Sequence, residues 1–112
     1  MRKIINGKTY NTEAAAVLAE WSKGYASDMA YFNESIHRTK NGNLFLYQDG
    51  GPLSSMSVDI GNNSTAGSHD IRALDEQECY EILAAWHDAN KIDADEMLYA
   101  CKIIGIAEPL EA

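Results

Sequence analysis

The sequence predicts a single domain of the α+β class, in which a small antiparallel sheet of three to five strands packs against an N-terminal helix and a C-terminal helical hairpin. Two Asn-Gly pairs, Asn6-Gly7 and Asn41-Gly42, separate short apolar runs and favour tight β-hairpins. Acid-rich starts at Asp75 and Asp93 precede apolar repeats with helical spacing. Because 46% of the 112 residues are apolar, the chain can bury one modest core.

The two Asn-Gly turns place the first predicted strands. These strands are Lys3–Ile5 with Lys8–Tyr10, and Ala30–Thr39 with Leu44–Gln48. Leu44–Tyr47 is apolar at every position, which predicts a central strand that is buried on both faces.

A helix is predicted between these hairpins, starting at a cap on Asn11 or Thr12 and running to about Ser22, with Gly24 just beyond its end. Its apolar residues follow the spacing i, i+3, i+4, i+7 of one helical face: Ala14, Val17, Leu18 and Trp21. We expect that face to cover the sheet.

Residues 49–70 are rich in Gly, Ser and Asn and predict a long polar loop, with a short strand near Met56–Val58. Asp70–Leu74 is expected to form another strand. Residues 1–74 therefore form the helix and β-meander part of the domain.

The remainder, residues 75–112, is predicted to be an acidic helical pair joined antiparallel by the short link Ala89–Ile92. The first helix runs from Asp75 to about Asp88 and the second from Asp93 to about Ile104, closed by Gly105. The residues expected to face inward are Cys79, Ile82, Leu83 and Trp86 on the first helix, and Met97, Leu98, Cys101 and Ile104 on the second.

Charge is divided unevenly along the chain. Residues 1–73 carry seven Lys or Arg and seven acids, whereas residues 74–112 carry ten acids and two lysines, so the net charge of −8 belongs to the last third. This field repels phosphate backbones and attracts basic surfaces. We therefore expect a protein partner with a basic surface and no direct nucleic-acid binding, while acidity that serves solubility alone stays open.

The chain shows no run of 18 apolar residues and no signal peptide at its start, so we expect a cytoplasmic protein without membrane association. In that compartment the two cysteines should be free thiols. A homodimer is compatible with these features.

Metal and nucleophile chemistry have little support in the sequence. The candidate ligands lack CxxC or HxxxH spacing: His37, His69, His87, Cys79 and Cys101. Both cysteines fall on apolar helical faces, where packing is the expected role. We predict no cofactor, no metal and no catalytic residue.

Two further motifs have simpler interpretations. Neighbours on a strand point to opposite faces, so Ser68-His69-Asp70 does not predict a catalytic triad, and His69 is expected in an exposed loop. Gly50-Gly51-Pro52 and the Gly61–Gly67 segment match no phosphate-binding pattern and indicate turns.

Aromatic residues gather around the central hairpin: Tyr25, Tyr31, Phe32, Phe45 and Tyr47. Most are expected in the core, but tyrosines on an uncovered sheet face would be contact residues. Beside the turn, His37, Arg38 and Lys40 predict a small basic edge, whose simplest interpretation is a solvated hairpin tip.

Three segments carry a family resemblance: KIINGKTYNTEAA, GNLFLYQDGGPLS and GNNSTAGSHDIRALDEQE. In this order they resemble a family of short uncharacterised bacterial and prophage proteins with blocks KIINGKxYDTETA, YRTKxGxxFLYGEGGxxS and IxPLTxxEAxxW. The likeness covers residues 3–86. His37 replaces the family's usual Tyr, and Gln48-Asp49-Gly50-Gly51 replaces Gly-Glu-Gly-Gly.

The resemblance implies cargo of phages or mobile elements, and small acidic proteins of that kind include anti-CRISPR inhibitors. We therefore expect a non-enzymatic inhibitor of a host nucleic-acid machine, most concretely of a Cas effector. The expected partner-binding residues are Glu76, Glu81, Asp88, Asp95, Tyr31, Tyr47 and Asp49. The alternatives are an interaction module without inhibitory role and a small ligand-binding protein or enzyme that uses the 49–70 loop.

Overall fold

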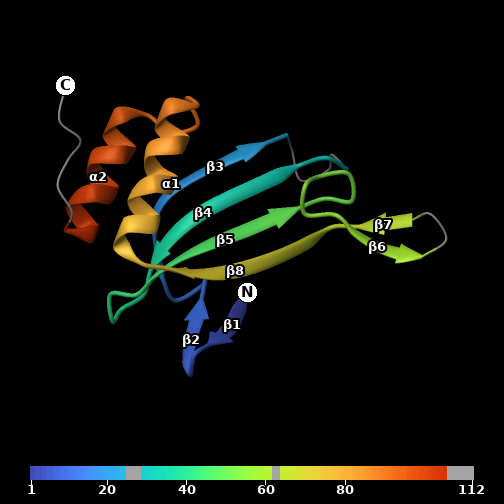
Figure 1. Cartoon of the computed structure of the whole chain (residues 1–112), viewed down its shortest axis with the longest axis horizontal. Helices are drawn as coiled ribbons and strands as arrows, with labels where there is room; N and C mark the ends of the chain where they lie inside the picture. Colours follow the sequence, from blue (N-terminus) through green and yellow to red (C-terminus); the bar gives the residue numbers. More distant parts are fainter. Residues whose placement is uncertain (25–28, 62–63, 106–112) are drawn as a thin grey trace.

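A computed structural model describes residues 1–24, 29–61 and 64–105 (Figure 1). Its centre is an antiparallel sheet with strand order β3–β4–β5–β8. These strands are β3 (Ala16–Lys23), β4 (Phe32–Arg38), β5 (Leu44–Gly50) and β8 (Ser68–Leu74). The remaining elements are the hairpins β1 (Arg2–Ile5)–β2 (Lys8–Asn11) and β6 (Val58–Gly61)–β7 (Ser64–Ala66), and the helices α1 (Glu76–Asp88) and α2 (Ala94–Ile104). The predicted α+β class is confirmed.

Both Asn-Gly turns form as predicted. Asn6 and Gly7 have φ angles of 50° and 76°, and Gly42 has a φ of 85°, values that tight hairpin turns require and glycine adopts freely. β5 lies between β4 and β8, so the prediction of a central strand is confirmed.

The predicted N-terminal helix is wrong, because the chain forms β3 there and pairs with β4 from Ala16↔Arg38 to Lys23↔Phe32. Both expected capping residues are engaged otherwise. The Asn11 side chain accepts a hydrogen bond from the Glu13 amide at 3.0 Å, which closes a turn. The Thr12 hydroxyl accepts one from the Met1 amine at 2.9 Å. Among the described residues, the helices that cover the sheet are therefore α1 and α2.

A β-bulge explains why β3 resembles a helix in sequence. The register between β3 and β4 shifts between Val17 and Ala19, so one extra residue is inserted there. As a result Leu18 and Ala19 are both buried, and Trp21 also packs against the main core. A spacing of three between Leu18 and Trp21 is normal on a helical face but reaches one face of a strand only through such a bulge.

The two C-terminal helices begin at the predicted caps. Asp75 accepts a hydrogen bond from the Glu78 amide at 2.7 Å, and the Glu78 carboxylate accepts one from the Asp75 amide at 3.2 Å. Asp93 likewise accepts one from the Glu96 amide at 2.8 Å. α2 ends at Gly105, whose φ of 84° is the left-handed conformation expected of a glycine cap.

The sheet buries residues on both faces. α1 and α2 cover one face, where the core includes Ile36, Leu46, Leu83 and Cys101. The β1–β2 hairpin lies against the other face, around a smaller cluster formed by Tyr10, Phe45 and Ile71. Figure 1 shows the helices and this hairpin on opposite sides of the sheet.

The predicted loop of residues 49–70 contains regular secondary structure. It contains the β6–β7 hairpin, which extends beyond the end of the sheet, and β8 begins two residues before the predicted start at Asp70 (Figure 1). A Cβ atom on Gly51 or Gly67 would collide with neighbouring backbone, of Met29 and Gly50 respectively. These glycines therefore permit the close crossing of chain segments that leave β5 and enter β8.

Candidate partner-binding surfaces

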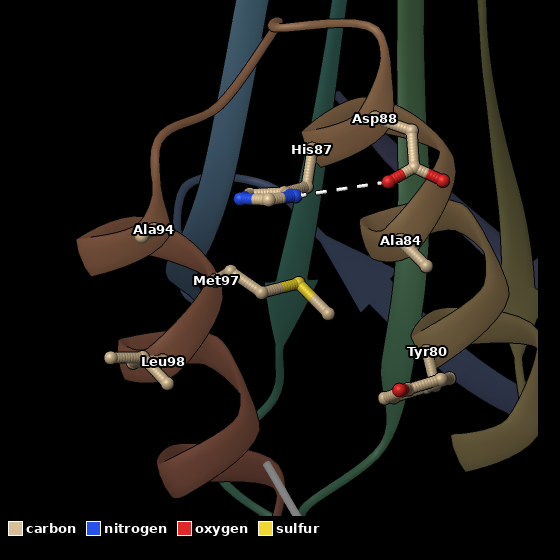
Figure 2. Close-up of a pocket in the computed structure, with 7 residues that line it drawn as sticks. All are labelled: Tyr80, Ala84, His87, Asp88, Ala94, Met97 and Leu98. Atoms are coloured by element: carbon tan, nitrogen blue, oxygen red, sulfur yellow. Dashed lines mark ion pairs between the residues drawn. The ribbon is translucent and has the colours of Figure 1, made fainter. Parts of the chain in front are cut away.

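A groove lies between α1 and α2 on the side away from the sheet (Figure 2). Its volume is about 490 Å³. The lining is mainly apolar and comes from both helices: Tyr80, Ala84, His87 and Asp88 of α1, and Ala94, Met97 and Leu98 of α2. Mainly apolar clefts of this size are typical of binding sites.

The groove exists because the apolar arc of each helix is wider than the sheet can cover. On α1 the residues Cys79, Leu83 and Trp86 are buried against the sheet, while Tyr80 and Ala84 lie beside them at the same i, i+4 spacing. On α2 Leu98 was expected to face inward, but it is 40% exposed at the groove. This expectation is wrong because Met97 and Cys101 already fill the sheet side of α2.

The four acids predicted as contacts on the helices lie on the two elements that form this groove. Asp88 lines it directly. Helical spacing places Glu76 one turn before Tyr80, Glu81 one turn before Ala84, and Asp95 one turn before Leu98: all lie on the exposed surface of their helix. Asp88 thus lies in the cleft itself, and helical spacing puts each of the other three acids next to a residue that lines it.

A negative charge stabilises the helix at some of these four positions and not at others. Glu76 and Asp95 stand in the first turns of α1 and α2, where a carboxylate interacts favourably with the helix dipole. Glu81 lies in the middle of α1. Asp88 is the last residue of α1, where a negative charge opposes the dipole, and its side chain is 85% exposed. The Glu81 carboxylate accepts a hydrogen bond from the Gln77 side chain one turn earlier, at 3.1 Å, a pair that supports the helix. Asp88 is therefore the acid that helix stability does not account for.

Figure 2 shows His87 and Asp88 at one end of the groove, with Met97 extending from α2 toward α1. The His87 Nδ1 atom lies 3.9 Å from the Asp88 carboxylate, a loose contact between exposed groups. A methionine adapts its shape readily to different apolar partners. The groove thus combines an adaptable apolar interior with a polar end.

The other predicted contact residues form a second surface. The Tyr31 hydroxyl donates a hydrogen bond to Asp49 at 3.1 Å, and Tyr47 lies two residues before Asp49 on β5 and hence on the same side of the sheet. Burial, followed by the hydrogen bond to Asp49, raises the pKa of Tyr31. Burial and the charge of Asp49 raise the pKa of Tyr47. Both tyrosines are therefore neutral hydrogen-bonding groups at physiological pH.

The predicted contact residues thus divide between two faces. Tyr47 packs against the smaller cluster, on the side of the sheet that the β1–β2 hairpin partly covers, and the four acids lie on the helices of the opposite side. Tyr25, which the sequence grouped with these aromatics, lies outside the described residues. A rigid partner with one flat surface would contact one of these two sites.

The predicted basic edge is wrong, because His37 is buried. Its ring stacks on Phe45 with centroids 4.8 Å apart, and its Nε2 atom lies 2.8 Å from the Ser35 hydroxyl. Burial and the positive charge of the Met1 amine lower the pKa of His37. The imidazole therefore belongs to the core and is neutral near pH 7.

Ser68, His69 and Asp70 are not assembled as a triad. Ser68 donates its hydroxyl hydrogen to the Met56 carbonyl, and the Asp70 carboxylate pairs with Lys3 at 2.7 Å. That hydrogen bond with Lys3 lowers the pKa of Asp70. His69 is exposed as expected, although it lies on β8 rather than in a loop. Each side chain has a separate structural or surface environment.

The cysteines pack as predicted. Cys79 and Cys101 are buried in the main core, and burial raises the pKa of Cys79 to about 12. Within residues 1–24, 29–61 and 64–105, no three His, Cys, Asp or Glu side chains are grouped so that they could hold a metal ion. Neither described helix is long and apolar enough to cross a bilayer.

The sequence did not predict the groove, and the assignment of the acids as partner contacts stays a prediction. Tyr80 and Ala84 form a second apolar row beside the predicted core row of α1. An apolar face of α1 wider than one core row was the sequence signal that could have predicted the groove. Together the fold and these surfaces define a small α+β domain with an acid-rimmed apolar groove. No protein-family model, curated protein or solved structure matches the chain.

Proposed function

We propose that this chain is a non-enzymatic protein of a phage or mobile element that binds a host nucleic-acid machine and inhibits it. The concrete form of this proposal is an anti-CRISPR protein that acts on a Cas effector in the host cytoplasm. The observation that carries it is the acid rim of the α1–α2 groove, where Asp88 lines the cleft although its charge opposes the dipole of α1. The resemblance of residues 3–86 to prophage proteins supports the same interpretation.

The mechanism we propose is occlusion. A protein that holds nucleic acid presents a basic channel, and an acidic surface competes with the phosphate backbone for it. The residues from 74 on supply the excess of negative charge, and the sheet holds both helices rigidly. Binding would then prevent the effector from engaging its target DNA.

Binding of a small ligand by residues 49–70 has less support. The glycines of this segment are explained by the close backbone crossing beside Met29 and Gly50. The β6 strand is exposed along its length, with Val58 and Ile60 open to solvent. An exposed two-stranded hairpin offers a ligand little enclosure.

The test is an inhibition assay with purified Cas effectors. Target cleavage and DNA binding are measured with the wild-type chain, with Glu81→Lys/Asp88→Lys, and with the single variants Glu81→Lys and Glu13→Lys. The last two change net charge equally, but Glu13 lies in the exposed turn before β3, far along the chain from the helices.

If the proposal is correct, the wild-type chain inhibits at least one effector, Glu81→Lys weakens inhibition, and Glu13→Lys leaves it unchanged. Inhibition should also decline as salt rises. If the wild-type chain inhibits none of the effectors tested, the proposed function is contradicted. Equal effects of Glu81→Lys and Glu13→Lys would mean that only total charge matters.

A further inference from the structure

We propose that the α1–α2 groove binds an amphipathic helix of the protein partner, with apolar side chains in the groove and Lys or Arg side chains against its acid rim. This inference rests on the proposed function and names the chemistry that the partner must present. It is carried by the juxtaposition of an open apolar cleft with the acids Glu81 and Asp88.

Large apolar side chains of α2 are exposed to solvent. Leu98 is 40% exposed, and farther along α2 Tyr99 and Ile103 are 52% and 38% exposed. The cleft of about 490 Å³ has the size of a site that takes one or two side chains. Tyr80 and Met97 line it from opposite helices, as Figure 2 shows, and both can adjust to an inserted side chain.

The shape of the cleft favours a helical occupant. The groove runs between two helices, and a third helix packs into such a groove through anchors spaced i, i+3 or i+4. Its lining on α1, from Tyr80 through Ala84 to His87 and Asp88, extends over about two turns. Ala84 at the centre leaves the space into which an anchor would enter.

Charge determines which helix fits. Among the described residues of α1 and α2 the basic side chains are His87 and Lys102, against the rim acids Glu76, Glu81, Asp88 and Asp95. Lys102 stands one turn after Leu98, at the end of the groove away from Asp88. A helix that places Lys or Arg beside Glu81 and Asp88 would therefore be favoured and an acidic one repelled.

The same charges argue against two other occupants. Residues 106–112 carry Glu108 and Glu111 and no basic residue, so the rim would repel them. A second copy of the chain would bring the same acids to the interface, which disfavours a homodimer through this face. A basic segment from a different protein is the occupant that the groove complements.

The experiment selects binders from a phage-displayed library of random 15-residue peptides on the full-length chain. Enriched peptides are then measured by fluorescence anisotropy. The variants are Ala84→Phe, which fills the groove, Leu98→Ser, which removes an exposed lining residue, and Glu81→Lys. Val58→Ser on β6 is the matched control for loss of an exposed apolar side chain. Circular dichroism verifies that each variant is folded.

We expect enriched peptides to carry apolar residues at i and i+3 or i+4 with flanking Lys or Arg. Ala84→Phe should weaken their binding about tenfold or more, as hot-spot changes do, and Val58→Ser should not. If Ala84→Phe does not fold, Leu98→Ser provides the same test. Failure to enrich any peptide, enrichment of acidic peptides, or undiminished binding by folded groove variants would overturn the inference.

These outcomes are separable from the fate of the proposed function. If peptide binding depends on Ala84 but no effector is inhibited, the groove is a helix-binding site and the proposed anti-CRISPR function is wrong. Inhibition that survives in folded Ala84→Phe and Leu98→Ser would retain the function and show that the groove is not the interface.

Discussion

Trp21 of β3 and Trp86 of α1 meet edge to face, with ring centroids 6.5 Å apart and ring planes at 71°. The Lys91 ammonium lies over the Trp21 ring, with its Nζ atom 3.8 Å from the ring centroid. The Nε1 atom of Trp21 donates a hydrogen bond to Glu34. One side chain of the edge strand therefore contacts α1, the α1–α2 connection and β4.

Truncation of Trp86 should destabilise the whole domain. Its side chain is almost completely buried, so Trp86→Ala should lower the free energy of unfolding by about 3–5 kcal/mol. That is a large part of the roughly 5–15 kcal/mol that holds a typical domain together. Urea denaturation measures the change, with Tyr99→Ala as the control because Tyr99 is half exposed. Similar losses in both variants would show that the core is misassigned.

Charge reversal at Asp88 should stabilise the fold while it weakens partner binding. A cation at the last residue of α1 complements the helix dipole, so Asp88→Lys should add about 0.3–1 kcal/mol. Glu76→Lys, at the first residue of the same helix, should instead lower the stability of the fold, because a cation there opposes the dipole. Thermal melts at low salt compare the pair. Destabilisation by Asp88→Lys would give Asp88 a structural role and remove the argument that its charge serves binding.

The burial of His37 predicts a loss of stability in mild acid. Because the folded-state pKa is lowered, the unfolded chain binds the proton more readily. Stability is therefore complete above the unfolded value, about 6.5, and falls as the pH drops from there toward the lowered folded value. Urea unfolding between pH 8 and pH 5 should show this decline in the wild type.

The variant His37→Phe should lose this pH dependence, because phenylalanine cannot titrate and can retain the stacking on Phe45. The pair of Asp70 with Lys3 does not interfere. The pKa of Asp70 is lowered below its usual value near 3.9, so that pair loses its contribution only in stronger acid. An identical pH profile for His37→Phe and the wild type would contradict the assignment.

The cysteines should be inert in the folded protein. Burial and a pKa raised to about 12 keep Cys79 protonated, and Cys101 is equally buried. A thiol reagent such as Ellman's should react slowly with the native chain and rapidly after unfolding. Cys79→Ala/Cys101→Ala should lose some packing but retain any inhibition. Rapid native labelling, or loss of inhibition by a folded double variant, would indicate a chemical role.

Several elements could be predicted because their signals are local. The turn at Asn6-Gly7 requires positive φ angles at both residues, and the turn at Asn41-Gly42 requires one at Gly42, a conformation that few residues other than glycine and asparagine accept. The caps at Asp75 and Asp93 use hydrogen bonds that span three residues. Such interactions depend on neighbours in the sequence, so the sequence alone specifies them. The same holds for the excess of acids after residue 74.

Other features depended on contacts distant in the chain. Residues 14–22 have helical apolar spacing, but pairing with β4 and the bulge beside Leu18 made them a strand. His37 has the sequence setting of a hairpin tip, but in the fold it is buried with its ring stacked on Phe45. The groove exists only where Tyr80 and Leu98 meet across two helices.

The sequence by itself therefore determined the turns, the helix starts, the central strand and the acidity of the helical pair. The tertiary structure decided the conformation of β3, the burial of His37 and the gathering of Glu81 and Asp88 at one cleft. The physical reason is that backbone preference in a short segment amounts to a few tenths of a kcal/mol per residue. Burial of a single large side chain contributes about 1.5–3 kcal/mol and can reverse that preference.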